Sequence, residues 1–353
     1  MRDIVDSSFI IDSYGYIFFL LLGLFLILKN YNKIFLIFLI IFSGFRGDIG
    51  TDFINHKKYY LFNINDSNLE VGYVGIMNLF AYFNFSIYHL QFFFSAATLI
   101  LVSIAINNYQ DKTKFFWIFY LVFPYAFLYS FIFIRQYIAI AIIFWSFNFL
   151  LKNKLLKFVI TVLIGSLFHY SCLFAGFLIY FLYYLSKSIT RNQLICLLTL
   201  SIPFAFINWF QLFRDFFEDS KYEGYFLQKN IININYIKLI LFNIEALFIL
   251  YFYDKVNKIN DNRKYFIVLA IFAIIFYNIF ASVNHLNRFS LYFKFFELIV
   301  LADIVYLNRK NIFLLLIMLL YVLSLFFNAL WFDYNRLGTH TKLVPYQNIL
   351  INK

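Results

Sequence analysis

The chain is a succession of apolar runs separated by short polar segments. A helix needs about 20 apolar residues to cross the hydrocarbon of a bilayer, and roughly 17 to 25 are tolerated. By this measure the sequence predicts an all-α integral membrane protein with about 12 membrane-spanning helices, within a range of about 10 to 14. The predicted spans lie near residues 14–28, 31–45, 86–106, 115–133, 135–151, 155–169, 170–186, 192–210, 236–253, 265–284, 287–306 and 311–331.

Three longer segments lie outside these spans. Residues 71–84 are apolar but too short to cross, and they predict a helix that lies in the membrane interface or re-enters it. If this segment crossed the membrane instead, the sidedness of everything before it would invert. The other two segments are polar loops at residues 45–70 and 211–235. Because no linker, low-complexity tract or clear internal repeat divides the chain, we expect a single polytopic membrane domain over residues 1–353.

The amino-acid composition agrees with a membrane protein. Hydrophobic residues make up 63% of the 353 residues and charged residues 13%, whereas soluble domains are typically about half apolar and about a quarter charged. A water-soluble fold is therefore excluded, because its surface would lack polar groups. The two cysteines, Cys172 and Cys196, fall inside apolar segments, which favours core packing over a disulfide or a thiolate metal site.

The distribution of charge predicts which side of the membrane each loop faces. The net charge is +11, but the basic residues stand singly or in small clusters between apolar runs, a pattern typical of topology-setting charges rather than of nucleic-acid binding. Alternating the loops puts 15 of the 29 basic residues and only 3 of the 18 acidic residues on one side. The positive-inside rule assigns that side to the cytoplasm. Both termini and the loops 45–70 and 211–235 then face outward from the inner (cytoplasmic) membrane.

Charged and polar side chains that are not needed as cytoplasmic anchors gather on the predicted outer side. Charges at membrane depth are costly and usually functional. The candidates are Arg46, Asp48 and Asp52 in the loop after the second span, Arg135 and Gln136 at the outer end of the fifth, His169 in the tight junction between the sixth and seventh, and His285, Arg288 and Tyr292 at the start of the eleventh. His285 and Arg288 are three residues apart and would share a helix face, which Tyr292 extends.

Three arginines and two histidines at one depth suit an anionic substrate at the membrane surface, and a lipid diphosphate is the natural candidate. An arginine fork binds phosphate oxygens through paired hydrogen bonds and stays charged at any relevant pH. We therefore assign Arg46, Arg135 and Arg288 to the diphosphate. A histidine that titrates near neutrality can take a proton from an attacking hydroxyl. His169 is accordingly the candidate general base, with Asp52 as the alternative.

Each candidate also has a structural interpretation. Arg135 and Arg288 stand at helix ends, where long side chains often reach toward the interface. His169 is open to interpretation as a cap of its helix junction, and Asp48 and Asp52 as turn formers. Two carboxylates without further ligands do not make a metal site, so no metal is expected. The histidines interpreted as structural are His56, His89 and His340.

Six segments, in a fixed order relative to the predicted spans, carry a resemblance to a known family. They are Phe-Arg-Gly-Asp-Ile-Gly-Thr-Asp (45–52), Leu-Glu-Val-Gly-Tyr (69–73), Ile-Arg-Gln-Tyr-Ile-Ala (134–139), Leu-Phe-His-Tyr-Ser (167–171), Asn-Arg-Phe-Ser-Leu-Tyr (287–292) and Val-Pro-Tyr (344–346). From about residue 15 to its C-terminus the chain resembles the EpsG family of Wzy-like O-antigen and exopolysaccharide polymerases. Val71 departs from the proline that often follows the glutamate in this family.

The resemblance implies a polysaccharide polymerase. Such an enzyme transfers a growing glycan from its undecaprenyl diphosphate carrier onto a new lipid-linked repeat unit at the outer face of the membrane. The implied partners are an undecaprenyl-diphosphate-linked oligosaccharide and the lipid bilayer, and a flippase and a chain-length regulator are candidate partners. No nucleic acid is expected. Because the donor carries its own activated linkage, no nucleotide cofactor, redox cofactor or metal is required.

Two other classes of function stay open. A flippase or exporter of lipid-linked oligosaccharide would also have about twelve spans, but it should place charges near the midplane of the bilayer and often shows repeated halves. A membrane acyltransferase that modifies a surface glycan would also use histidine and aspartate, but it needs an acyl donor reachable from the cytoplasm. The candidate site lies on the predicted outer side, which favours the polymerase.

Overall fold

The structure is a computed structural model, and it describes residues 9, 12–50, 52–62, 69–110, 113–207, 209, 234–283, 286–335 and 343–350. Within these residues the chain is helical and contains no β-strand, which confirms the predicted all-α fold. The chain divides into two compact units, Met1–Cys172 with Asn308–Lys353, and Leu173–Leu307, which are described separately. The single membrane domain expected over residues 1–353 stays a prediction.

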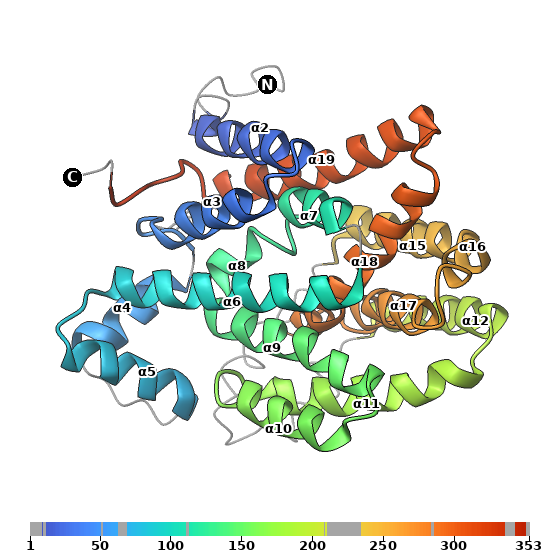
Figure 1. The fold of residues 1–353 in the computed structure, drawn as a ribbon, viewed down its shortest axis with the longest axis horizontal. Helices are drawn as coiled ribbons and strands as arrows, with labels where there is room; N and C mark the ends of the chain where they lie inside the picture. Colours follow the sequence, from blue (N-terminus) through green and yellow to red (C-terminus); the bar gives the residue numbers. More distant parts are fainter. Residues whose placement is uncertain are drawn as a thin grey trace. The chain divides into compact units, whose positions relative to one another are not determined.

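The first unit is built around α9. Its helices are α2 (Tyr14–Leu28), α3 (Asn32–Gly44), α4 (Phe53–Phe62), α5 (Val71–Tyr82), α6 (Ile87–Tyr109), α7 (Thr113–Val122), α8 (Tyr129–Ile132), α9 (Ile134–Leu151), α10 (Leu155–Ser166) and α19 (Ile312–Tyr334). α9 packs against α6 and α10, and α6 also packs against α3 (Figure 1). Of the most apolar window of α9, 78% is buried, against 22% for α19. An apolar helix buried on all faces lies in a core, whereas the exposed apolar face of α19 suits a lipid surrounding.

Asparagines make the tight turns between successive helices of this unit. Asn30 follows α2, Asn84 follows α5 and Asn153 follows α9, with φ angles of 60°, 54° and 54°. Asparagine adopts this left-handed conformation more readily than most residues, because its short polar side chain can bond locally. In each case the next helix therefore begins within a few residues.

The segment 343–350 holds the loop that follows α3. The Gly47 N–H donates to the Gln347 carbonyl at 2.8 Å, and the Ile349 N–H donates to the Phe45 carbonyl at 3.0 Å. The ring of Tyr346, which belongs to the Val-Pro-Tyr segment, stacks on that of Phe42 with centroids 4.1 Å apart. The backbone of residues 45–47 is thereby fixed by a part of the chain about 300 residues away.

The second unit contains most of α11 and the helices that follow it. Its elements are α11 (Ser171–Ser188), α12 (Arg191–Ser201), η1 (Ile202–Phe206), α15 (Tyr236–Tyr251), α16 (Tyr253–Asn257), α17 (Arg263–Ile279), η2 (Asn287–Ser290) and α18 (Leu291–Leu307). α17 packs against α12, α15 and α18. On α18 the buried Lys294 ammonium donates to both carboxylate oxygens of Glu297, at 2.8 and 2.7 Å. A buried charge without such a partner would be strongly destabilising.

Helices occupy every one of the predicted spans, but not every span is one long helix. Within the described residues, four helices are long and apolar enough to cross a membrane, namely α6, α9, α11 and α19. These support a membrane protein. The other apolar helices are shorter, so the number of about 12 crossings stays a prediction.

Two of the predicted spans contain a proline. In the span predicted at 115–133, α7 ends at Val122, two residues before Pro124, and α8 begins only at Tyr129. In the span predicted at 192–210, α12 ends at Ser201 and Pro203 lies in η1. Proline lacks an N–H and disfavours the α conformation in the residue before it. The helix is broken before Pro124, which counting apolar residues could not predict, whereas α12 continues directly into η1, so that Arg191–Phe206 forms one apolar helical segment.

The segment between α3 and α6 contains two helices, of which one was expected. α5 covers the apolar segment predicted at 71–84, and its position in the membrane interface stays a prediction. α4 lies within the loop predicted at 45–70, where mixed apolar and charged residues gave no helical signal. Of the outward loop predicted at 211–235, the structure describes only residues 234 and 235.

Cys172 is buried, as expected, whereas Cys196 is exposed on α12, and both are free thiols. The prediction that Cys196 packs in a core was therefore wrong, because a membrane protein also exposes apolar segments on its surface.

Candidate functional site

Two candidate side chains of the first unit, Arg135 and His169, meet at the carboxylate of Glu70. Glu70 accepts a hydrogen bond from His169 Nδ1 on Oε1, at 2.9 Å, and forms an ion pair through Oε2 with Arg135 Nη1. The Glu70 side chain is 4% exposed, whereas those of Arg135 and His169 are 26% and 32% exposed. We call these three residues the Glu70 cluster. The Glu70 side chain is therefore buried, while those of Arg135 and His169 reach the surface.

Three different helix ends position the members of the Glu70 cluster. Glu70 is the N-cap of α5 and has an extended backbone, with φ −70° and ψ 137°. Arg135 is the second residue of α9, and His169 lies in the short junction between α10 and α11. Val71 is then the first residue of α5, a position that proline also favours. The departure from the family pattern at Val71 therefore leaves the start of the helix in place.

The electrostatics of the cluster keep Glu70 charged. Burial raises the pKa of the Glu70 carboxyl, but the hydrogen bond from His169 and the positive charge of Arg135 oppose it, and the pKa lies below its usual value. An ionised carboxylate only accepts hydrogen bonds, so the proton in this contact belongs to His169 Nδ1. In a neutral imidazole the lone pair is then on Nε2. Within the described residues Nε2 has no hydrogen-bond partner.

The guanidinium of Arg135 has N–H groups that Glu70 does not use. It gives Nη1 to Glu70, and in the described part of the chain it makes no further hydrogen bond. Its guanidinium lies 5.6 Å from the centre of the Tyr73 ring, and the Tyr73 hydroxyl bonds His56 Nδ1 at 2.8 Å. Burial, together with the charges of Arg135 and Arg46, lowers the pKa of His56 to about 3. His56 is therefore neutral and supports the aromatic ring beneath Arg135.

Arg46 does not present its guanidinium at the surface. The side chain is fully buried. Nη1 donates to the Ser43 carbonyl and to Ser95 Oγ, the latter at 3.0 Å, and Nη2 donates to the Phe131 carbonyl at 3.5 Å. The expected surface position was wrong, because carbonyl groups of α3 and α8 bind the guanidinium in the interior once these two helices pack. Arg46 ties the two helices together.

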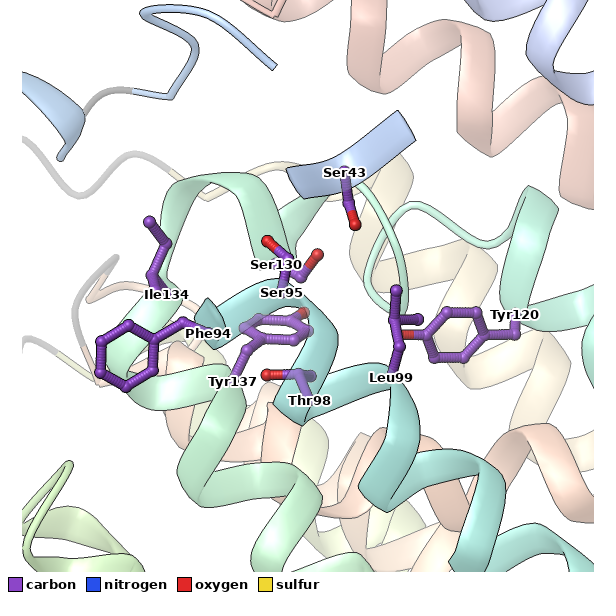
Figure 2. Close-up of a pocket in the computed structure, with 9 residues that line it drawn as sticks. All are labelled: Ser43, Phe94, Ser95, Thr98, Leu99, Tyr120, Ser130, Ile134 and Tyr137. Carbon is purple, nitrogen blue, oxygen red and sulfur yellow. The ribbon is translucent and has the colours of Figure 1, made fainter. Parts of the chain in front are cut away.

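A small cavity lies beside these contacts. Ser43 and Ser95 line it, and Figure 2 shows the hydroxyl groups of both, with those of Ser130 and Thr98 nearby. Its volume is about 10 Å³, which is roughly the space that one water molecule requires. A diphosphate does not fit there, so the cavity supports no substrate role for Arg46.

Three further candidates, Asp48, Asp52 and Gln136, also lie in the first unit. Asp48 accepts from Lys57 Nζ on Oδ2 at 2.8 Å and from the Tyr88 hydroxyl on Oδ1 at 2.6 Å, which joins α4 to α6. Asp52 is half-buried and precedes α4. Gln136 is buried on α9, next to Arg135. Arg135 and His169 are the two candidates that contact Glu70 in the described part of the chain.

The candidates of the eleventh span belong to the second unit. Arg288 is partly buried in η2, and Tyr292 is buried in the first turn of α18. Because α18 begins at Leu291, the predicted helix face does not include Arg288. His285 lies outside the described residues, as does His340.

Glu70 was missed as a site residue, although the sequence carries a signal for it. It belongs to the segment Leu-Glu-Val-Gly-Tyr, and no other charged residue occurs between residues 67 and 110. A single carboxylate at the edge of a long uncharged stretch is costly to bury unless it is paired. Its pairing with Arg135 and His169 depends on the packing of α5 against the rest of the unit.

Comparison with known proteins gives one match. The sequence model of the EpsG family matches residues 29–348, nearly the whole chain. A search of curated proteins and a search of solved structures gave no match.

Proposed function

The chain belongs to the EpsG family, whose members are Wzy-like polymerases, and we propose from this that it is a polysaccharide polymerase of the cytoplasmic membrane. It transfers a glycan from an undecaprenyl-diphosphate-linked donor to a lipid-linked repeat unit, on the outer face of the membrane. The observation that supports specific catalytic residues is the 2.9 Å contact between Glu70 Oε1 and His169 Nδ1, which leaves the His169 Nε2 atom free to accept a proton.

The proposed chemistry is a single displacement at the donor's anomeric carbon. An acceptor sugar hydroxyl gives its proton to His169 Nε2, and its oxygen forms a bond to that carbon. The bond from the carbon to the diphosphate oxygen breaks, and undecaprenyl diphosphate leaves with the electron pair. Glu70 holds the imidazole in the right tautomer and stabilises the imidazolium that forms, as a carboxylate does for a histidine base in other enzymes.

Arg135 has the complementary role in this proposal. With Nη1 on Glu70, its remaining N–H groups can bind a diphosphate oxygen of the leaving group. Neutralising that charge helps the carrier to leave. Arg288, which belongs to the second unit, stays a separate candidate for binding a diphosphate, and Asp52 stays the alternative base. The activated donor linkage supplies the driving force, so these roles need no cofactor.

Deleting the gene tests the proposed function against its nearest competitor. Without a polymerase, single repeat units still reach the surface, so a gel of the surface glycan should show chains capped with one repeat and no ladder. Loss of a flippase would leave no repeat unit at the surface. The second pattern would move the protein to the transporter class, and an unchanged ladder would exclude both.

A further inference from the structure

The start of α5 is bonded directly to the junction that carries His169. The Gly72 N–H donates to the Leu167 carbonyl at 2.9 Å, and the Tyr73 N–H points to the same oxygen at 3.3 Å. These N–H groups are in the first turn of a helix, where they have no partner within the helix itself. Leu167 satisfies them. One carbonyl therefore joins the segment that carries Glu70 to the segment that carries His169.

This contact requires a residue without a side chain at position 72. A Cβ at Gly72 would lie 2.7 Å from Leu167 Cβ and 2.8 Å from the Leu167 carbonyl oxygen, both closer than real Cβ contacts. Backbone atoms cannot turn aside as the end of a flexible side chain can. Gly75, one turn further along α5, has nothing within 4 Å of its Cβ position. Gly72 and Gly75 lie in the same helix, but a Cβ would clash with Leu167 only at position 72.

The junction transmits a displacement at Leu167 to His169. The His169 N–H donates to the Gly165 carbonyl at 3.2 Å, and the His169 carbonyl accepts from the Cys172 N–H at 2.9 Å. His169 is therefore held on both sides, two residues from Leu167. Glu70 stands two residues before Gly72. A separation at the Gly72–Leu167 contact would therefore move apart the two segments that carry the Glu70 carboxylate and the imidazole.

We propose that Gly72 is a positioning residue for the transfer reaction: its close approach to Leu167 sets the distance between Glu70 and His169. The inference rests on the proposed function. Gly72 does not contact the substrate in this proposal. A change at Gly72 should therefore affect the orientation of His169 but not the binding of the lipid-linked sugar.

The matched variants are Gly72→Ala and Gly75→Ala, compared in purified protein at equal amounts with lipid-linked repeat units. A misplacement of about 1 Å in a catalytic site costs about 100-fold in rate. The kcat of Gly72→Ala should fall by about 10- to 100-fold with little change in KM. Gly75→Ala should keep both values. Equal kcat for Gly72→Ala and the wild type would overturn the inference.

A double variant separates positioning through Glu70 from a general structural defect. If Gly72 acts through Glu70, Gly72→Ala combined with Glu70→Gln should lose no more kcat than Glu70→Gln alone. Multiplied losses would contradict the inference. If Gly72→Ala accumulates poorly in the membrane, the kcat is measured on the folded fraction alone, and a wild-type kcat in that fraction would also contradict the inference. A wild-type protein that makes no long chains would overturn the proposed function as well as this inference.

Discussion

His169→Ala should make no long glycan chains, while it binds lipid-linked substrate as tightly as the wild type. A positioned general base typically contributes about 100- to 10,000-fold to the rate. The cluster would lose the imidazole that Glu70 orients, and with it the group that takes the proton from the acceptor hydroxyl. Chain length on a gel and the kcat of purified protein, both at equal protein level, measure this loss.

His169→Gln distinguishes a base from a structural histidine. Glutamine can still donate a hydrogen bond to Glu70, but it cannot take a proton at neutral pH. If His169 is the base, this variant should be as inactive as His169→Ala. His89→Gln is the matched control, because His89 is exposed and only caps the start of α6. Long chains from His169→Gln would place the base elsewhere, and Asp52 would then be the residue to change.

Arg135→Lys should keep the positive charge but lose the planar guanidinium, with its paired N–H donors, and with it much of the activity. A lysine can pair with Glu70, but a single ammonium cannot reach the carboxylate and the diphosphate together in the geometry of a guanidinium. Hydrogen bonds to charged groups contribute about 1.5–3 kcal/mol, which corresponds to about 10- to 150-fold in rate. The amount of protein in the membrane should not change.

The control for Arg135→Lys is Arg191→Lys. Arg191 forms a long ion pair with Asp254 at 3.7 Å, and both side chains are exposed, so the exchange should have little effect. If Arg135→Lys polymerises as well as Arg191→Lys, the guanidinium of Arg135 only reaches toward the interface, as other long side chains at helix ends do.

The helices could be predicted because each depends on a local property of the chain. In a bilayer a run of apolar residues such as residues 134–151 forms a helix, because a helix satisfies its backbone hydrogen bonds internally. The break at Pro124 is equally local and could have been predicted from the proline. α4 could not, because its buried residues Phe53 and Tyr60 belong to a hydrophobic cluster with residues of α5, α6 and α9.

The site could be predicted only one residue at a time. Arg135 and His169 were recognised because each is a polar group at the end of an apolar run. Their common partner, Glu70, is separated from them by 65 and 99 positions, and no pattern along the chain specifies that contact. Arg46 shows the opposite error. Its position after α3 suggested a surface cation, whereas its hydrogen bonds to Ser95 and the Phe131 carbonyl bury it.

The most direct measurement uses the purified wild-type protein in lipid vesicles supplied only with undecaprenyl-diphosphate-linked repeat units. A polymerase should produce a ladder of longer lipid-linked chains and release one undecaprenyl diphosphate for each new linkage. The ladder should form without added nucleotide. Repeat units that stay single, or that change sides of the vesicle membrane without growing, would contradict the proposed polymerase.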